Sequence, residues 1–372
     1  MKALILSCST GEGHNSAAKA VLMALEERGI ECTLIDPISL KSKKASHIAA
    51  EAYNGIIRRV PFLFGIIYKL GQAYNALNLP SPVRWANKKY TKELKEYILE
   101  NKFDFVVCSH IYPMYAMCHI KQELGLNIPT YTVLTDYTAI PFYKDIGALD
   151  FHFVSCEETK RFLSKKGKDF TEDKIYISGI PVNYKFEEKI SQKEAREKLN
   201  IPEDKKIITL LSGGAGCGKI SKLSKKFDKS LDENHLILVF VGKNQKLKEK
   251  LSKKFSDNKK FRLVDFTTDV YLYVKASDVV LSKPGGLSST EIAAANVPLV
   301  HLKAIPGCES YNVKHFVSRG ISVYGKSVRS AVRHTLTLLE NEDKREEMLK
   351  NQRENIPQNS AKTIAKMIED FQ

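Results

Sequence analysis

Short apolar runs alternate with longer amphipathic stretches along most of the chain. Residues 2–7 form an apolar run that predicts a buried strand, and residues 15–28 place small and aliphatic side chains at helical spacing before Gly29. Strands separated by helices are typical of parallel sheets with right-handed crossovers. Further strands are predicted at residues 31–35, 105–109, 130–134, 151–154, 206–212, 235–241, 261–264, 279–282 and 299–302.

This alternation restarts after Gly179-Ile-Pro-Val-Asn-Tyr-Lys185, which predicts a domain boundary. A chain of 372 residues is long for a single core, which agrees with two domains. We expect a doubly wound α/β domain at residues 1–180 and a second one at residues 186–355. A C-terminal helix in residues 356–372 is expected to pack on either half, the N-terminal one included. Glycine loops follow strands in both halves, at the edge where open parallel sheets bind ligands.

Composition narrows the class of protein. The net charge of +15 favours acidic partners such as phosphorylated substrates, anionic membranes or nucleic acid. Seven scattered cysteines without a Cys-x-x-Cys pair argue against a disulfide framework or a zinc site and favour a reducing compartment. No apolar run approaches the ~20 residues that span a bilayer, and the N-terminal run is too short for a signal peptide. We therefore expect a soluble or peripheral protein.

The loop after the predicted strand at residues 279–282 has the composition of a phosphate-binding turn. Pro284-Gly-Gly286 precedes a predicted helix at residues 288–295. Glycine permits a close backbone approach, and a helix N-terminus offers N–H groups and the positive end of its dipole. Glu291, about one turn into the helix, is long enough to reach a sugar diol beside that phosphate. The alternative is an ordinary strand–turn–helix with a surface glutamate.

A second carboxylate follows a second tight turn. Glu309 comes directly after Ile305-Pro-Gly-Cys308, and its side chain is long enough to reach another polyol. A phosphate-binding turn with two carboxylates suits a nucleotide-sugar better than a bare nucleotide.

Two residues at predicted strand ends are candidate general bases. His14 lies in the predicted glycine loop 10–14, and a histidine facing the sheet edge has a pKa that is tunable near neutrality. The alternative is a histidine that caps the helix or packs locally. Asp136 follows the apolar strand at residues 130–134 and is a second candidate base or orients the acceptor. Its alternative is a helix N-cap.

The segment Gly213-Gly-Ala-Gly-Cys-Gly-Lys219 nearly matches a Walker A loop. The position that needs a hydroxyl for Mg²⁺ is Ile220, with Ser221 one place late, and no convincing acidic metal strand follows. A glycine loop that lets the backbone approach a diphosphate is therefore favoured over an NTPase site.

Residues 58–95 combine apolar and basic side chains. An apolar and aromatic stretch at residues 60–79 is interrupted by Lys69 and Gln72, and Glu93 is the only acid in the window. This pattern favours a segment in the interface of an anionic membrane over a buried helix pair with a solvated basic face. Nucleic-acid binding is not expected, because the aromatics are not spaced for base stacking. The basic residues that flank the apolar stretch are Arg58, Arg59, Arg84, Lys88, Lys89, Lys92 and Lys95.

Several motifs, taken together and in order, resemble the glycosyltransferases that make galactolipids and glucolipids (glycosyltransferase family 28). The chain is similar along nearly its whole length to plant monogalactosyldiacylglycerol synthases and to the processive diacylglycerol glucosyltransferases of Gram-positive bacteria. It is more distantly similar to the N-acetylglucosaminyltransferase that completes the lipid-linked peptidoglycan precursor. The motifs are Gly11-Glu-Gly-His14-Asn-Ser-Ala-Ala, Val133-Leu-Thr-Asp136, Gly179-Ile-Pro-Val, Lys283-Pro-Gly-Gly and Ile305-Pro-Gly-x-Glu309-x-x-Asn312.

The resemblance implies a GT-B fold, with two Rossmann-like domains facing a central cleft. It implies inverting transfer from a UDP-sugar, with no bound metal and no permanent cofactor. By match of motif, Glu291 would hold the ribose diol of UDP and Glu309 the hydroxyls of the donor hexose. His14 would be the base or its helper, with Asp136 as the alternative. The other donor-side residues would be Gly13, Gly214, Gly216, Phe266, Gly285, Gly286, Leu287, Ser288, Cys308 and Asn312.

The chain departs from the family pattern at three places, which concern the identity of the sugar and of the acceptor. Cys308 stands where many relatives have glutamine, Ile140 lies in a loop where some have histidine, and Tyr143 replaces a frequent tryptophan.

We therefore expect hexosyl transfer from a UDP-sugar to diacylglycerol or a related lipid by a cytoplasmic protein on the inner face of the cell membrane. The alternatives are transfer to another acceptor, such as a polyprenyl-linked sugar or a soluble metabolite, and a non-catalytic UDP-sugar sensor. The charge alone suggests a third, nucleic-acid binding.

Overall fold

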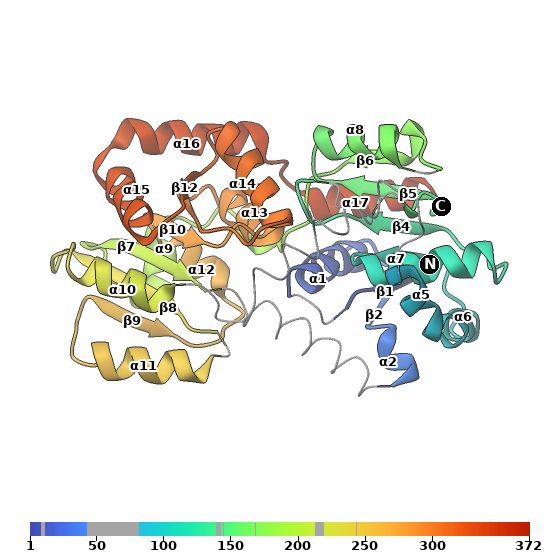
Figure 1. Ribbon diagram of the computed structural model, residues 1–372, viewed down its shortest axis with the longest axis horizontal. Helices are drawn as coiled ribbons and strands as arrows, with labels where there is room; N and C mark the ends of the chain where they lie inside the picture. Colours follow the sequence, from blue (N-terminus) through green and yellow to red (C-terminus); the bar gives the residue numbers. More distant parts are fainter. Residues whose placement is uncertain are drawn as a thin grey trace. The chain divides into compact units, whose positions relative to one another are not determined.

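The computed structural model describes residues 1–8, 12–42, 82–138, 143, 145–167, 169–212, 219–242 and 244–372. These residues form two compact units, each built on its own sheet (Figure 1). Unit 1 consists of Met1–Tyr184, Pro306–Cys308 and Gln358–Gln372, and unit 2 consists of Lys185–Ile305 and Glu309–Pro357.

Unit 1 contains six parallel strands in the order β2-β1-β3-β4-β5-β6. Leu6, at the end of β1, pairs with Ile35 of β2 and with Cys108 of β3, so that the carboxyl ends of these strands are level. The strands are β1 (Lys2–Leu6), β2 (Glu31–Ile35), β3 (Phe105–Cys108), β4 (Thr130–Val133), β5 (Phe151–Val154) and β6 (Ile175–Ile177).

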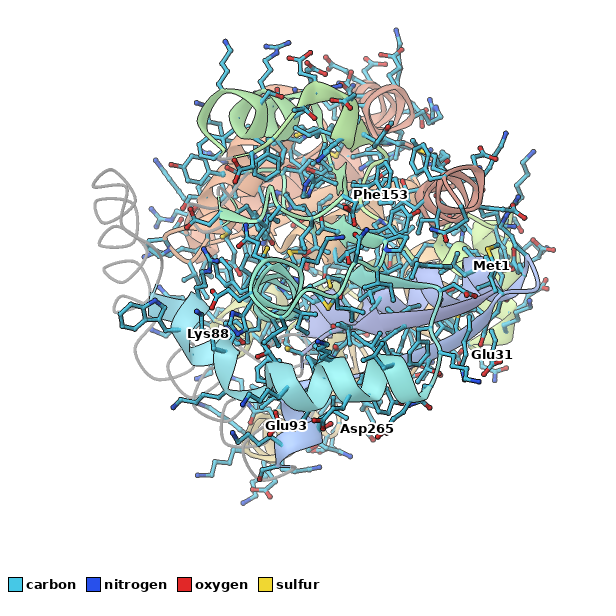
Figure 2. All side chains as sticks on the ribbon, turned by 90° about the vertical axis from the view of Figure 1, so that its right-hand side faces the viewer. Met1, Glu31, Lys88, Glu93, Phe153 and Asp265 are labelled. Carbon is cyan, nitrogen blue, oxygen red and sulfur yellow. The ribbon has the colours of Figure 1, made fainter. Side chains whose placement is uncertain are left out.

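Helices cover both faces of this sheet, which explains why its strands are continuous apolar runs. Ala3 and Ile5 pack with α1 (Glu12–Glu26) and the C-terminal helix α17 (Ser360–Asp370), whereas Leu4 and Leu6 pack with α6 and α7. The other helices of this unit (Figure 2) are α2 (Ile38–Lys41), α5 (Pro82–Asn87), α6 (Thr91–Glu100), α7 (Ile111–Gln122) and α8 (Glu157–Lys166). Its 3₁₀ turns are η1 (Lys88–Tyr90) and η3 (Glu172–Lys174), and a further turn, η4 (Tyr184–Phe186), lies at the boundary with unit 2.

The end of the chain is part of unit 1 (Figure 1, red helix α17). Ile364, Ala365 and Ile368 are fully buried in the cluster that contains α1. The Phe371 ring stacks on Phe151 with centroids 4.5 Å apart, and Arg28, in the turn after α1, pairs with Glu369. The last helix therefore covers one face of the first sheet.

Unit 2 contains six parallel strands in the order β12-β11-β10-β7-β8-β9. This is the Rossmann arrangement, whose order reverses between β7 and β10, and ligands bind outside the carboxyl ends of the strands at such a point. Its strands are β7 (Lys206–Leu211), β8 (His235–Phe240), β9 (Phe261–Val264), β10 (Val279–Ser282), β11 (Leu299–Leu302) and β12 (Val323–Gly325). Its helices are α9 (Gln192–Lys198), α10 (Ile220–Asp228), α11 (Gln245–Phe255), α12 (Val270–Lys275), α13 (Gly286–Ala294), α14 (Cys308–Ser318), α15 (Val328–Glu340) and α16 (Glu342–Asn355).

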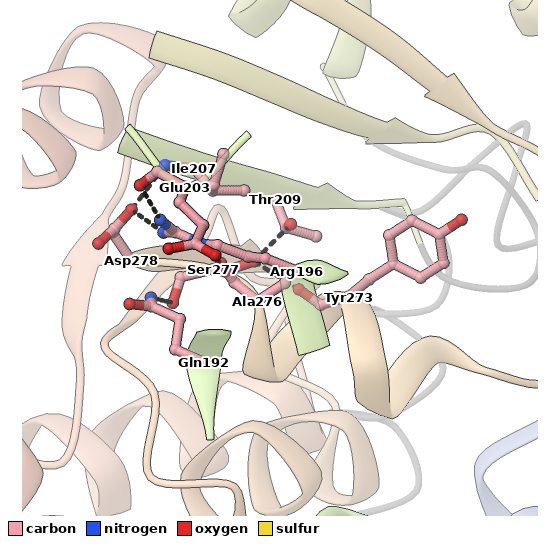
Figure 3. A network of polar contacts seen from close by, with 9 residues as sticks. All are labelled: Gln192, Arg196, Glu203, Ile207, Thr209, Tyr273, Ala276, Ser277 and Asp278. Carbon is pink, nitrogen blue, oxygen red and sulfur yellow. Dashed lines mark hydrogen bonds and ion pairs between the residues drawn. The ribbon is translucent and has the colours of Figure 1, made fainter. Parts of the chain in front are cut away.

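A buried ion pair holds the opposite, amino-terminal edge of this sheet (Figure 3). Arg196 of α9 donates to Asp278, just before β10, at 2.9 Å, and the same carboxylate accepts the backbone N–H of Ile207 in β7 at 2.6 Å. The guanidinium also donates to the carbonyl of Ala276 at 3.0 Å. With its charge paired and its donors bonded, Arg196 connects the start of the two central strands.

Two helices begin earlier than the sequence predicts. α1 begins at Glu12, so the predicted loop 10–14 is wrong for Glu12, Gly13 and His14, and α13 begins at Gly286 instead of residue 288. Glycine near a helix start hides the boundary, because it lowers helix propensity in the pattern while remaining compatible with helical angles. The edge strands β6 and β12 were not predicted, since three residues carry too short a pattern.

Candidate functional site

His14 is held by the ends of neighbouring strands in unit 1. It lies in the first turn of α1, directly after β1. Its Nδ1 atom is 3.0 Å from the carbonyl oxygen of Ser109, which follows β3, and 2.8 Å from Oγ1 of Thr135, which follows β4. The imidazole is thus fixed at the edge of the sheet where ligands bind, and it does not cap its own helix.

These contacts determine the tautomer of His14. A carbonyl oxygen only accepts hydrogen bonds, so the contact with Ser109 places the proton of the neutral ring on Nδ1. The lone pair is then on Nε2, which is the atom able to take a proton from a hydroxyl. Burial lowers the pKa of His14, and the negative charge of Asp136 and the bond to Ser109 oppose this shift. His14 is therefore mainly neutral at pH 7, as a base requires.

Asp136 lies close enough to His14 for its charge to act on the ring. It is half-buried in the bend 136–138 after β4, and its carbonyl oxygen accepts a bond from the Ser155 hydroxyl at 2.7 Å. Because no helix begins at residue 137, the alternative of an N-cap is wrong. The two candidate bases predicted from the sequence are thus brought together from different strands.

His110 is a neighbour of His14 that the sequence reasoning missed. It is 5% exposed, and its ring meets the His14 ring edge-on with centroids 4.6 Å apart. Its Nδ1 accepts the backbone N–H of Tyr112 at 3.2 Å and so caps α7. Burial lowers its pKa well below the usual range, and the charge of His14 adds to that effect. Its position after a predicted strand was the same signal that singled out His14.

The start of α13 in unit 2 presents backbone donors. The first intrahelical bond runs from the N–H of Ser289 to the carbonyl of Gly285 at 3.0 Å. The N–H groups of Gly286, Leu287 and Ser288 therefore have no acceptor within the helix. Gly285 has φ −73° and ψ 142°, which any residue adopts, and a Cβ added there would meet nothing within 4 Å. Neither the backbone angles nor packing against the described part of the chain requires glycine at this position, and close approach of a ligand is a reason for glycine here.

Buried polar contacts hold this turn in place. Asn312 of α14 is fully buried, and its side-chain amide donates to the carbonyl of Pro284 at 3.1 Å. His301 of β11 lies between the hydroxyls of Ser289, at 2.8 Å, and Ser322, at 3.0 Å. Burial lowers the pKa of His301 to about 3, so it stays neutral. The Asn312 side chain therefore stabilises the turn from within the protein and is not exposed at its surface.

Glu291 lies within α13, half-buried, and none of the residues that the structure describes forms an ion pair or a hydrogen bond with its carboxylate. Burial alone raises its pKa to about 8. An acid without a compensating partner is costly to bury as an anion, and such groups are common at functional sites. A ligand hydroxyl would supply the missing donor.

Glu309 in the first turn of α14 is already engaged. Its Oε2 accepts the backbone N–H of Ile305 at 2.8 Å, and its Oε1 lies 3.6 Å from the Nζ of Lys283. Cys308 precedes it and is half-buried. Glu309 therefore closes its own turn and joins it to the Lys283 loop, with its second oxygen beside a cation.

The other predicted residues divide between described and undescribed segments. Gly13 lies in the first turn of α1 next to His14, and Phe266, after β9, is 62% exposed. Gly214 and Gly216 lie outside the described residues, as do Ile140 and residues 58–81 of the predicted membrane segment. Tyr143 is 1% exposed and belongs to the core of unit 1.

Two Rossmann-like sheets of this kind define the GT-B fold, as predicted. MurG from Acinetobacter baumannii has a TM-score of 0.66 at 15% identity, covering 99% of both chains. The structure of Staphylococcus aureus MnaA with UDP also has a TM-score of 0.66, at 14% identity, covering 100% of this chain and 96% of the other. At these identities the likeness shows the fold alone.

Sequence comparison shows which proteins the chain resembles. Residues 14–182 match the model of monogalactosyldiacylglycerol (MGDG) synthase, and residues 191–355 match that of glycosyl transferases group 1. A processive diacylglycerol beta-glucosyltransferase of Bacillus cytotoxicus is 26% identical over 355 residues, covering 92% of this chain and 87% of the relative. The chain is a glycosyltransferase, and its predicted resemblance to the MGDG synthase and processive diacylglycerol glucosyltransferase family is confirmed. Among the described residues, no helix has both the length and the apolarity needed to cross a bilayer.

Proposed function

We propose that the protein transfers a hexose from a UDP-sugar to diacylglycerol or a related membrane lipid, with inversion at the anomeric carbon and without a bound metal. The name of the Bacillus cytotoxicus relative favours glucose as the first donor to test. The observation that carries the donor half is the start of α13, where three backbone N–H groups lack helical acceptors. They lie three to five residues before Glu291, whose carboxylate has no partner among the residues that the structure describes.

On the donor side, the N–H groups of Gly286, Leu287 and Ser288 would bind the diphosphate and offset the charge that builds on it as it leaves. Glu291 would accept hydrogen bonds from the ribose diol. Glu309, which closes its own turn, would direct its Lys283-facing oxygen toward the hexose. The glycine loop with Gly214 and Gly216 would line the diphosphate, and the uracil would lie against the backbone near Phe266.

On the acceptor side, Nε2 of His14 would take the proton of the lipid hydroxyl while that oxygen attacks the anomeric carbon from the face opposite UDP. Asp136 would stabilise the imidazolium that forms, because its charge already acts on the ring. The proton therefore moves from the acceptor to His14, and the bonding electron pair leaves with UDP. Backbone dipoles, rather than a metal ion, would offset the negative charge of the departing UDP.

A diacylglycerol acceptor would be reached at a membrane surface. We infer a peripheral association with the inner face of the cell membrane through residues 58–95, of which the structure describes residues 82–95. Their basic side chains would attract anionic lipids, at about 1 kcal/mol for each residue close to the surface.

The test is transfer by purified protein given UDP-glucose, UDP-galactose or UDP-N-acetylglucosamine with dispersed diacylglycerol and a chelator. The expected product is a hexosyl lipid found by mass spectrometry, with anomeric inversion shown by NMR. Glu291→Ala is the matched loss-of-donor variant. A product that partitions into water would show that the acceptor is a soluble molecule instead of a lipid. Loss of the product when the chelator is added would show that the reaction needs a metal. UDP binding without transfer to any acceptor would indicate a sensor.

A further inference from the structure

The imidazole of His301 lies where the turn before α13 begins. His301 of β11 pairs in register with Ser282, the last residue of β10, and Pro284-Gly285 come just after that residue. Its Nε2 atom is 2.8 Å from the hydroxyl oxygen of Ser289 in the first turn of α13. His301 and Ser289 are both fully buried. A side-chain bond thereby joins the sheet to the helix start that offers the free N–H groups.

Ser289 is the residue at which α13 closes its first turn. Its N–H donates to the carbonyl oxygen of Gly285 at 3.0 Å, the first bond within the helix. Its hydroxyl is directed to His301, whereas the hydroxyl of the next residue, Thr290, bonds back along the helix to the carbonyl of Gly286 at 2.8 Å. Serine hydroxyls inside helices can bond back in the same way. The Ser289 hydroxyl therefore anchors the first turn to the sheet and not to the helix itself.

A second hydroxyl and an aromatic ring fix the orientation of the imidazole. Nδ1 of His301 is 3.0 Å from the hydroxyl oxygen of Ser322, just before β12, and Ser322 is buried as well. The ring of Phe316 in α14 meets the imidazole edge-on with centroids 5.3 Å apart. A neutral imidazole has one donor and one acceptor, and a hydroxyl can take either part, so both ring nitrogens are bonded. Rotation of the ring would break both contacts.

We propose that His301 is a positioning residue for the donor, and that through Ser289 it holds the first turn of α13 in the orientation in which the free N–H groups converge on the diphosphate. This inference rests on the proposed function and names the contact that sets the geometry of that site. His301 is fully buried, so it does not touch the donor itself. Hydrogen bonds weaken as they lengthen and bend, so a small displacement of this turn acts on every bond to the diphosphate at once.

The first test compares the affinity for UDP with that for uridine, which lacks the diphosphate. Ser289→Ala is expected to weaken UDP binding by about tenfold, the low end of what one hydrogen bond to a charged group contributes, and to leave uridine binding within about twofold. Calorimetry measures the binding of UDP, and NMR titration measures that of uridine. Equal losses for the two ligands would overturn the proposal, and so would an unchanged affinity for UDP.

Thr209→Val is the matched control. Thr209 and Ser277 form another buried hydroxyl pair in unit 2, with oxygens 2.6 Å apart (Figure 3). Ser277 precedes β10, so this pair lies at the opposite end of that strand from the turn. The substitution also removes one hydroxyl from a buried pair and is expected to leave UDP affinity within about twofold. The same loss of UDP affinity in Thr209→Val as in Ser289→Ala would reduce the effect to lost stability and overturn the proposal.

Phosphorus NMR at saturating UDP reports on the alignment of the N–H groups separately from affinity. Binding to the wild type is expected to move the β-phosphate signal away from its position in free UDP. The displacement should be smaller in Ser289→Ala and unchanged in Thr209→Val. Identical bound signals in Ser289→Ala and wild type would overturn the proposal.

Apolar replacement separates alignment from stability. His301→Leu leaves the hydroxyls of Ser289 and Ser322 buried without this partner and should lower the free energy of unfolding. Adding Ser289→Ala and Ser322→Ala removes those hydroxyls and should recover part of the loss, while UDP binding stays about tenfold weaker than in the wild type. Recovery of UDP affinity together with stability would overturn the proposal. A wild type that does not bind UDP would contradict the proposed function instead.

Discussion

The Nδ1 atom of His14 lies 3.0 Å from the carbonyl oxygen of Ser109, an acceptor contributed by a different strand. This contact assigns the proton to Nδ1 and leaves Nε2 free to act as a base. The helix that carries His14 sets its position along the sheet edge, and the end of β3 sets its tautomer. A residue found in one motif thus depends on a partner 95 positions away.

Replacing His14 by alanine is expected to lower kcat by about 10²–10⁴-fold with little change in UDP affinity, since a positioned base contributes about that much. In the wild type, the acid limb of kcat/KM should lie below pH 6.5, because burial lowers the pKa of His14 from that value. Steady-state rates from pH 5 to 8 measure both. If His14→Ala kept the full kcat, Asp136 would be the base instead of His14.

Binding of UDP is expected to release protons through Glu291. Its pKa is about 8 in the free protein, so it is mostly protonated at pH 7, and a ribose diol that donates to the carboxylate favours the ionised form. Calorimetry at pH 7 in two buffers of different ionisation enthalpy counts the protons released. Glu291→Gln is the control that corrects for ionisation of UDP itself, and equal counts in the two proteins would remove Glu291 from the site.

The same group predicts how stability depends on pH. The pKa of Glu291 is raised from 4.5 to about 8, so between these values the unfolded chain has lost a proton that the folded chain retains. Stability from this group is therefore present at low pH and is lost as the pH rises toward about 8. Glu291→Gln should unfold at a higher temperature than wild type at pH 8.5, with a smaller difference at pH 4.5. Thermal melts at both values measure it, and a variant less stable at pH 8.5 would contradict the sign.

Gly285→Ala separates ligand approach from folding. The extended angles and the open space around its Cβ predict stability within about 0.5 kcal/mol of wild type. A methyl group against the diphosphate should weaken UDP binding by about tenfold, or about 1.4 kcal/mol. Gly29→Ala is the matched control: its φ of +77° predicts a loss of about 1–2 kcal/mol of stability with UDP affinity unchanged. Calorimetry measures the UDP affinity, and denaturant unfolding measures the stability.

Glu309 is tested by comparing two substitutions. Alanine removes both the bond to the Ile305 N–H and the carboxylate, whereas glutamine keeps an oxygen for the turn and removes the charge beside Lys283. Glu309→Ala should raise KM for UDP-glucose by about ten- to a hundredfold, as loss of a bond to a charged group implies. Glu309→Gln should fall between alanine and wild type, and UDP alone should inhibit all three with constants within about threefold. An equal loss of UDP inhibition would assign Glu309 to the nucleotide instead of the hexose.

Several parts of this protein follow from the sequence by itself. Apolar runs separated by helical periodicity predict parallel sheets covered on both faces, and both six-stranded sheets have this form. The motifs around His14, Asp136 and Glu291 predict the resemblance to glycolipid glycosyltransferases, because each combines a turn with a side chain whose chemistry the turn can present. These are local properties, encoded by residues a few positions apart.

The tertiary structure alone decided which residues meet. Strand order placed Ser109, Thr135 and His110 around His14, and the packing of α9 on the second sheet set Arg196 against Asp278. The packing of α14 determined that the Asn312 amide donates to the carbonyl of Pro284, and the burial of β11 determined that His301 stays neutral. No local pattern contains this information, because strand pairing, burial and the pKa shifts they cause depend on contacts between segments that the sequence separates by tens to hundreds of residues.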